Sequence, residues 1–223
     1  MTDVTTEDDA NRNNRLVLLM ITGIPLTMIL AATWLWYYVV QGDLDLVSAL
    51  GTANRGALVQ PPRQVDEVGL SEMSGAPIAY ADLPRKWTMV VPNNGAECGA
   101  SCEQLLYLTR QIHIAMGKEF ARIGRLYLSE QPVQATALTV DALGDGRPAP
   151  EDFQALLETE HRGLKALTMA TGGYDSLFAE QREDPSTWYL VDPSGWVMMS
   201  YNSAITYKDV ISDLKFLLKN SSE

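Results

Sequence analysis

Hydrophobic residues follow two different patterns along the chain, and the first is an unbroken apolar segment near the N-terminus. Residues 16–40 carry no charged side chain. At about 1.5 Å per residue this segment is longer than the roughly 30 Å hydrocarbon core of a bilayer, so it predicts a transmembrane helix over 15–40. Four aromatic residues stand at its C-terminal end, namely Trp34, Trp36, Tyr37 and Tyr38. Aromatic rings favour the headgroup region, which supports a membrane anchor.

A cleaved signal peptide is the alternative interpretation of this segment. Signal peptides have an apolar region of about 7–15 residues and then a small-residue cleavage site, whereas this segment is longer and ends in bulky aromatic residues. Arg12 and Arg15 precede the segment, and Asp43 and Asp45 follow it. The positive-inside rule therefore predicts a single-pass protein of the inner (cytoplasmic) membrane, with its N-terminus in the cytoplasm and its C-terminal part in the periplasm.

The second pattern lies beyond this anchor, where short β-rich runs alternate with segments of helical periodicity. Strands are predicted at 77–80, 87–91, 126–129, 135–140, 187–191 and 196–201. Helices are predicted over 99–118, 150–161 and 207–218. Strands that alternate with helices predict an α/β fold with a mixed sheet.

Polar and turn-forming stretches set the predicted domain boundaries. Residues 1–14 are polar and charged and predict a disordered cytoplasmic tail. Residues 41–65 contain Gly and Pro and predict a linker, so one domain is predicted over 66–223. The net charge of −11 argues against nucleic acid or an anionic lipid surface as a partner, because both attract a basic patch.

Cys98 and Cys102 are the only cysteines of the chain, and they lie where a predicted strand gives way to the predicted helix 99–118. Backbone N–H groups at a helix start favour anions, so a thiol there ionises readily and can attack disulfides or bind Cu(I). Cys98 is expected to be the more exposed thiol and the attacker. Glu103 is expected to raise the pKa of Cys102, which suits a resolving role. The alternative is a passive disulfide or two inert buried thiols.

Four motifs carry a resemblance to a known group of proteins. They are the segment 75–77, Asp82-Leu83 before Lys86-WTMVV, Cys98-GAS-Cys102, and Tyr189-LVDPSG195. With these motifs, residues 66–220 resemble the thioredoxin-like superfamily and, within it, the Sco/SenC group of cytochrome c oxidase assembly proteins. The resemblance implies a thioredoxin-like mixed sheet flanked by helices, thiol–disulfide exchange, Cu(I) bound by Cys98 and Cys102, and an oxidase subunit or a copper carrier as partner.

The chain departs from that group at two positions near the site. Sco proteins carry a proline after the second cysteine, where this chain has Glu103, and their third copper ligand, a histidine, falls on Asp184. An aspartate oxygen suits Cu(I) poorly, so the resemblance implies transient two-sulfur handling of Cu(I) rather than storage. Pro185 lies roughly where thioredoxin folds place a cis-proline beside the cysteines.

The two histidines are not expected to complete a copper site. His113 lies eleven residues beyond Cys102, about 16 Å along a helix, and predicts a helix-surface side chain. His161 stands near the end of a predicted helix and is expected to be solvated.

Three functions remain open from the sequence. The first is an anchored assembly factor for a haem-copper oxidase that acts through thiol–disulfide exchange at Cys98 and Cys102 and handles Cu(I) transiently. The second is a general periplasmic thiol–disulfide oxidoreductase. The third is a non-catalytic anchored binding module with an inert disulfide.

Overall fold

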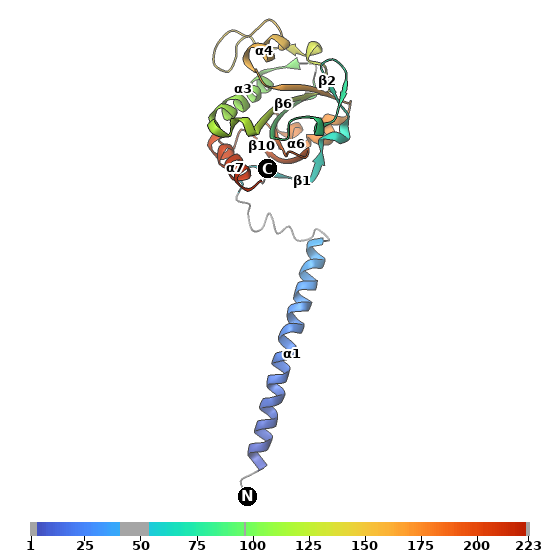
Figure 1. The fold of residues 1–223 in the computed structure, drawn as a ribbon, viewed down its shortest axis with the longest axis vertical. Coiled ribbons are helices and arrows are strands. Elements are labelled where there is room, and N and C mark those ends of the chain that lie inside the picture. Colours follow the sequence, from blue (N-terminus) through green and yellow to red (C-terminus); the bar gives the residue numbers. More distant parts are fainter. Residues whose placement is uncertain (1–3, 41–53, 96, 222–223) are drawn as a thin grey trace. The chain divides into compact units, whose positions relative to one another are not determined.

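The computed structural model describes residues 4–40, 54–95 and 97–221, which belong to two units, Met1–Ala53 and Asn54–Glu223 (Figure 1). The first unit contains the helix α1 (Val4–Val40), whose stretch Val17–Tyr37 is long and apolar enough to cross a membrane. The helix begins at Val4, so 4–14 are helical where the sequence predicts a disordered tail. Extending an existing helix costs little once the apolar segment has nucleated it.

The aromatic residues at the end of α1 are placed as the membrane prediction expects. Trp34, Trp36 and Tyr37 present exposed side chains, and none of the apolar stretch is buried inside the structure. Tyr38 belongs to the helix, but its side chain lies outside the described residues. The predicted transmembrane helix is therefore confirmed as a membrane-span candidate.

The second unit is built on a mixed sheet of eight strands, in the order β1-β10-β9-β4-β6-β8-β2-β3. Strands β4, β6 and β8 run parallel, and the other neighbours pair antiparallel. The strands are β1 (Ala57–Gln64), β2 (Leu70–Glu72), β3 (Pro77–Ile78), β4 (Trp87–Asn93), β6 (Ile123–Ser129), β8 (Lys165–Met169), β9 (Trp188–Val191) and β10 (Trp196–Tyr201). A separate two-stranded sheet pairs β5 (Glu97–Cys98) with β7 (Ala137–Leu138) in parallel.

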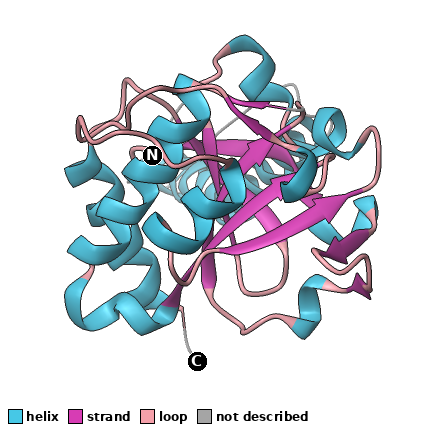
Figure 2. Ribbon diagram, turned by 90° about the horizontal axis from the view of Figure 1, so that it is seen from above, coloured by secondary structure: helices cyan, strands magenta, loops and turns pink. Residues whose placement is uncertain are grey.

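Helices cover both faces of this sheet (Figure 2). They are α3 (Ala100–Ala115), α4 (Phe153–Glu160), α5 (Gly173–Leu177), α6 (Ala179–Glu183) and α7 (Tyr207–Asn220), with the 3-10 turns η1 (Val65–Val68), η2 (Tyr80–Asp82), η3 (Gly117–Arg122) and η4 (Val133–Ala135). Alternate residues of β4 face opposite sides: Met89 and Val91 pack under α3, α4 and α7, whereas Val90 packs towards η1 and α5. The predicted mixed sheet flanked by helices is confirmed.

Strand β1 lies inside the predicted linker, so the domain begins before the predicted boundary at residue 66. Its sequence, ALVQPPRQ, holds two prolines and no apolar alternation, so it carries little strand propensity of its own. It forms because β10 offers it an edge, and the register shift between Leu58 and Arg63 accommodates the prolines there. The part of the predicted linker from 41 to 53 lies outside the described residues.

Most of the predicted elements are confirmed, but several short elements of the structure were not predicted. The runs 87–91, 126–129, 187–191 and 196–201 form β4, β6, β9 and β10, and the three predicted helices form α3, α4 and α7. Of the predicted strands 77–80 and 135–140, only β3 and β7, of two residues each, are formed. Strands β2, β5 and β8 and the five-residue helices α5 and α6 are absent from the prediction. Segments this short do not show a full hydrophobic period, so their structure depends on the sheet and loops around them.

Candidate functional site

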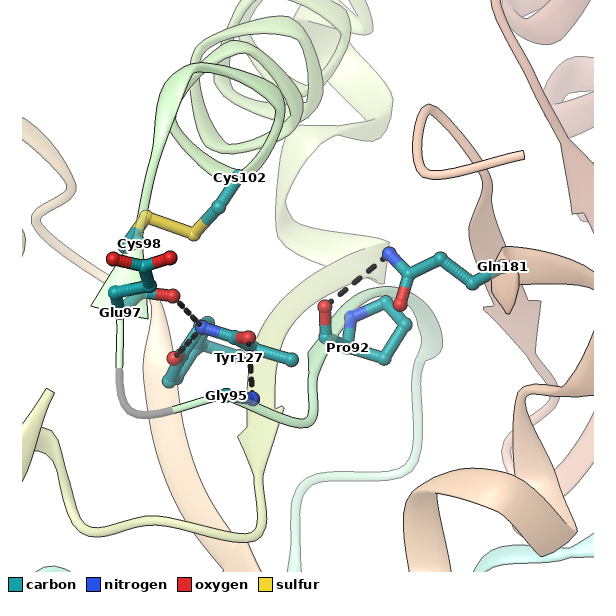
Figure 3. The surroundings of a disulfide bond; sticks show 8 residues. Pro92, Gly95, Glu97, Cys98, Cys102, Tyr127 and Gln181 are labelled. Carbon is teal, nitrogen blue, oxygen red and sulfur yellow. Dashed lines mark hydrogen bonds between the residues drawn. A yellow bond between two sulfur atoms is a disulfide. The ribbon is translucent and has the colours of Figure 1, made fainter. Parts of the chain in front are cut away.

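The two cysteines lie just beyond the C-terminal end of β4, at one end of the sheet (Figure 3). After Asn93 the chain turns and forms β5, which ends at Cys98, and α3 begins at Ala100. Cys98 and Cys102 form a disulfide with a Cα–Cα distance of 5.2 Å. The pairing of β5 with β7 fixes the first cysteine, and the Thr139 N–H donates to the Cys98 carbonyl at 3.1 Å.

Asn93 organises the turn that leads into the cysteine pair. Its Nδ2 donates to the Glu97 carbonyl at 3.0 Å and to the Tyr127 hydroxyl at 2.8 Å, and its Oδ1 accepts from the Gly95 N–H at 3.0 Å. Tyr127 is fully buried in the core, and burial raises the pKa of its phenol. The turn is therefore tied to the core through one amide side chain (Figure 3).

The two sulfurs differ in their access to solvent. Cys98 is 0 % exposed and belongs to the core under α3, whereas Cys102 is partly exposed and lines an open groove of about 570 Å³. The expectation that Cys98 is the more exposed thiol is therefore wrong. The reason is that β5 turns Cys98 inward, while Cys102 lies in the first turn of α3, on the side of the helix that faces the groove.

Gln181 and Pro185 form the opposite wall of this groove. Gln181 is buried, and its Nε2 donates to the carbonyls of Pro92 at 3.3 Å and Thr187 at 2.9 Å, which ties α6 to the end of β4. The peptide bond before Pro185 is trans, so the suggested cis-proline is wrong, although Pro185 does lie beside the groove as expected. Sequence analysis missed Asn93 and Gln181, because an amide in a turn or short helix carries no distinctive pattern.

Glu103 directly follows Cys102 in the sequence but does not line the groove. Its side chain is buried in the first turn of α3, and both carboxylate oxygens accept the Gly144 N–H at 3.1 Å. Glu103 therefore fastens the loop 141–149 to the start of the helix. Its predicted effect on the Cys102 thiol remains a prediction.

Asp184 holds a turn of the backbone and does not line the groove. It accepts hydrogen bonds from the Ser186 N–H at 2.9 Å and the Ser186 Oγ at 2.6 Å, and these bonds lower the pKa of the Asp184 carboxyl. Two of its four acceptor positions are thus already used within the chain. The position where the resemblance expects a third copper ligand serves the local fold instead.

Neither histidine lies in the groove. His113 is partly exposed and stacks on Phe120, with a ring-centroid distance of 3.7 Å. His161 is 2 % exposed, so the expected solvated side chain is wrong, and burial together with Arg125 and Arg110 lowers its pKa to about 3. Across 4–40, 54–95 and 97–221, no group of three or more His, Cys, Asp or Glu side chains could hold a metal ion.

The chain is similar to known proteins in both sequence and structure. A family model described as the transmembrane-like, thioredoxin-like C-terminal domain matches residues 87–221, which is more than half of the 223 residues. A search of curated protein sequences found no match.

Several solved structures are similar to this chain. A structure of yeast Sco1 aligns with a TM-score of 0.48 and 14% identity, over 78% of this chain and 99% of that one. A SCO1/SenC family lipoprotein from Bacillus anthracis aligns with a TM-score of 0.47 and 19% identity, over 67% and 92%. Copper-bound ScoI from Bradyrhizobium japonicum aligns with a TM-score of 0.44 and 18% identity, over 72% and 98%.

Proposed function

The chain belongs to the family of transmembrane-like, thioredoxin-like C-terminal domains, and we propose that it exchanges thiols and disulfides at Cys98 and Cys102. The observation that carries the proposal is the disulfide at the strand-to-helix junction, whose outer sulfur, that of Cys102, faces an open groove. A disulfide buried on all sides would be inert, whereas one sulfur open to a partner permits exchange.

Exchange at this pair proceeds in two steps. A client thiolate attacks the Sγ of Cys102, the Cys98–Cys102 bond breaks, and the electron pair leaves on Cys98 as a thiolate. A second client thiolate then attacks the client sulfur of the mixed disulfide and releases Cys102. The client dithiol loses two electrons and becomes a disulfide, and the domain gains those electrons. In the reverse direction Cys102 attacks a client disulfide and Cys98 resolves the intermediate.

The surroundings of Cys98 favour its role as the leaving and resolving thiol. Helix α3 begins at Ala100, two residues beyond Cys98, and the partial positive charge of a helix start stabilises a thiolate. Because Cys98 is buried, a client thiol cannot reach it directly, which keeps the released sulfur for the intramolecular step. The roles expected from the sequence for the two thiols are therefore exchanged in this proposal.

The client we propose is a haem-copper oxidase subunit or a copper carrier, at the periplasmic side of the inner membrane. This part rests on the resemblance of the four motifs to the Sco/SenC group of cytochrome c oxidase assembly proteins and on the apolar helix α1. A membrane anchor keeps the exchange site near clients embedded in the same bilayer, which raises their effective concentration.

The groove does not supply the donor set of a resident copper site. Reduced Cys98 and Cys102 would provide two soft sulfur ligands, but Asp184 is outside the groove and neither histidine reaches it. Thiol exchange on a copper-site cysteine pair therefore fits these residues better than retention of Cu(I). An anaerobic Cu(I) titration of the reduced full chain tests this against its Cys98→Ala/Cys102→Ala variant, and equal affinities would remove any copper role for the pair.

The exchange itself is tested with glutathione disulfide as the probe. In the full chain, Cys98→Ala leaves only Cys102 and should form a mixed disulfide that intact-mass spectrometry detects. Cys102→Ala leaves only the buried Cys98 and should react at least about tenfold more slowly. Ser101→Ala, an exposed neighbour, is the matched control and should behave as wild type. Faster labelling of Cys98 than of Cys102 would contradict the assigned roles.

The reduction potential separates this function from the third possibility, an inert disulfide in a binding module. A potential above about −300 mV is expected, because structural disulfides generally lie below that value. A lower potential would refute both the assembly function and a general oxidoreductase. An oxidoreductase without a dedicated oxidase client would instead reduce unrelated disulfides as fast as those of a copper-site cysteine pair.

A further inference from the structure

A second cavity, of about 630 Å³, lies at the opposite end of the parallel strands from the cysteines. It is lined by residues at or before the starts of β4, β6 and β8, including Lys86, Gly124 and Gly163. Since β4 spans Trp87–Asn93, roughly 20 Å of strand separates this cavity from the turn before Cys98. Strand β8 pairs with β6 only from Leu126 onward, so no β8 residue covers the preceding part of β6, and part of the cavity lies there.

Basic side chains outnumber acidic ones in the wall of this cavity, although the chain as a whole has a net charge of −11. The basic residues are Lys86, His113, Arg125, Arg162 and Lys165, and the acidic ones are Glu72 and Asp82. Lys165 is neutralised by Glu72, with 2.7 Å between Nζ and Oε1, and Asp82 accepts the Ala79 N–H at 3.1 Å.

Three of these cations have no carboxylate partner within the described part of the chain. Lys86, Arg125 and Arg162 each lie more than 4.0 Å from the carboxylate oxygens of the described Asp and Glu residues. Burial lowers the pKa of His113 below its ordinary value, so this side chain adds little positive charge at neutral pH. Lys86, Arg125 and Arg162 carry +3 and the Asp82 carboxylate carries −1, so the wall keeps a net charge of +2 once the Lys165–Glu72 pair is set aside.

Arg125 makes this excess of charge costly, because it is buried. Its side chain is 4 % exposed; Nη2 donates to the Leu106 carbonyl at 2.8 Å and to Thr109 Oγ1 at 3.3 Å, and Nε has no hydrogen-bond partner. His161 Nδ1 lies 3.3 Å from Nη2, but His161 is neutral and cannot balance the charge. A buried guanidinium without a counter-ion destabilises a fold, and an anion in the adjoining cavity would offset that cost.

The rest of the wall is apolar, which adds a second requirement for the ligand. Ile78, Leu83, Phe120 and Leu126 line the cavity beside the cations. A volume of this size suits a small organic molecule rather than a bare ion. A net charge of +2 also matches a phosphate monoester, which carries about −1.5 to −2 at pH 7, better than a singly charged carboxylate.

We propose that this cavity binds an organophosphate, with the phosphate monoester among Lys86, Arg125 and Arg162 and an apolar body against Ile78, Leu83 and Phe120. The site is independent of the cysteine pair and of the function proposed for it. The guanidinium groups suit the phosphate oxygens, because they present paired N–H donors in a planar fork.

The test is calorimetric titration of the full chain in neutral detergent with phenyl phosphate, and with phenol as the uncharged analogue. Binding of phenyl phosphate and not of phenol is expected. Lys86→Glu and Arg162→Glu should each weaken the affinity at least about tenfold, because a reversed charge near the phosphate repels it. Lys208→Glu is the matched control: it lies on α7, is exposed and does not line the cavity, and should bind as wild type.

A second arm identifies the source of the phosphate. Dihexanoyl phosphatidic acid carries the same monoester on a short-chain lipid. Tighter binding of it than of phenyl phosphate assigns the cavity to a lipid headgroup, and weaker binding assigns it to a free organophosphate. The proposal is overturned if neither compound binds at millimolar concentration, or if Lys86→Glu and Arg162→Glu bind phenyl phosphate as tightly as Lys208→Glu does.

Discussion

Asp213 joins the start of the domain to its C-terminal helix, and its replacement is the sharpest test of how the fold is held together. The side chain is 3 % exposed on α7, and its Oδ2 accepts from the Arg55 N–H at 2.9 Å, the Gly56 N–H at 3.0 Å and the Tyr201 hydroxyl at 3.2 Å. The first two donors lie just before β1. The Asp213 carboxylate therefore joins helix α7 to strand β10 and to the segment that leads into β1.

The magnitude follows from the three donors that Asp213→Ala would leave without an acceptor. A hydrogen bond to a charged group contributes about 1.5–3 kcal/mol, and an unsatisfied buried donor costs about 1–3 kcal/mol. The three effects are not additive, because all three donors share the one oxygen Oδ2 and water can enter the vacated space. We expect a loss of about 3–5 kcal/mol in the free energy of unfolding, a large part of the total for a domain of this size.

Asp209, one turn earlier on the same helix, is the matched control. Its Oδ1 lies 3.9 Å from Arg55 Nε, and the two side chains are 40% and 71% exposed. An exposed ion pair contributes about 0–1 kcal/mol. Asp209 Oδ2 also accepts from Thr206 Oγ1 at 2.7 Å, and an ordinary hydrogen bond contributes about 0.5–1.5 kcal/mol. Asp209→Ala should therefore cost no more than about 2 kcal/mol.

Urea unfolding of the full chain, followed by tryptophan fluorescence, measures both losses. A second readout is the titration of Tyr201, whose pKa is raised by burial and then by Asp213. In Asp213→Ala this phenol should ionise at a lower pH than in wild type, which a loss of stability alone would not produce. A cost for Asp213→Ala no larger than that for Asp209→Ala, or an unchanged Tyr201 titration, would contradict this role of Asp213.

Three further predictions concern the site and the buried polar groups. Reduction of the disulfide should lower the free energy of unfolding by only about 2 kcal/mol, because the cysteines are four residues apart; a loss above about 4 kcal/mol between oxidised and reduced samples would indicate a structural bond. His161 protonates at about pH 3 in the folded state and near 6.5 when unfolded, so its contribution is present above pH 6.5 and lost as the pH falls towards 3; His161→Asn should remove that part of the pH dependence of the urea midpoint. Asn93→Ala should speed amide hydrogen exchange at Gly95 by about tenfold or more, and unchanged exchange there would mean that the turn is held by other contacts.

Much of the fold could be predicted because the central strands are strongly apolar. The run 87–91 is buried on both faces in β4, and such a run of apolar residues between turns is typical of a central strand. Helix α3 shows its buried face as Leu105, Leu106, Thr109 and Ile112 at helical spacing. The local sequence alone therefore favours a strand at 87–91 and a helix at α3.

The peripheral elements could not be predicted, because their stability comes from their partners. The edge strand β1 contains Pro61 and Pro62 and depends on pairing with β10, and β2 has only three residues between β8 and β3. The site shows the same division. The cysteine spacing is visible in the sequence, but Asn93 acts through the Tyr127 hydroxyl, 34 residues along the chain, and Gln181 acts through the Pro92 carbonyl, 89 residues away.

The sequence by itself determined the helix that is long and apolar enough to cross a membrane, the class of fold and the position of the cysteine pair, because each depends on a local pattern: apolar length, periodicity and the spacing of two thiols. The tertiary structure decided which sulfur faces the groove, because the direction of Cys98 is set by the pairing of β5 with β7. It also decided where charge gathers. The net charge of −11 predicts no attraction for anions, yet the fold brings Lys86, Arg125 and Arg162 from separate segments to one cavity, and a sum over the chain cannot show such a local excess.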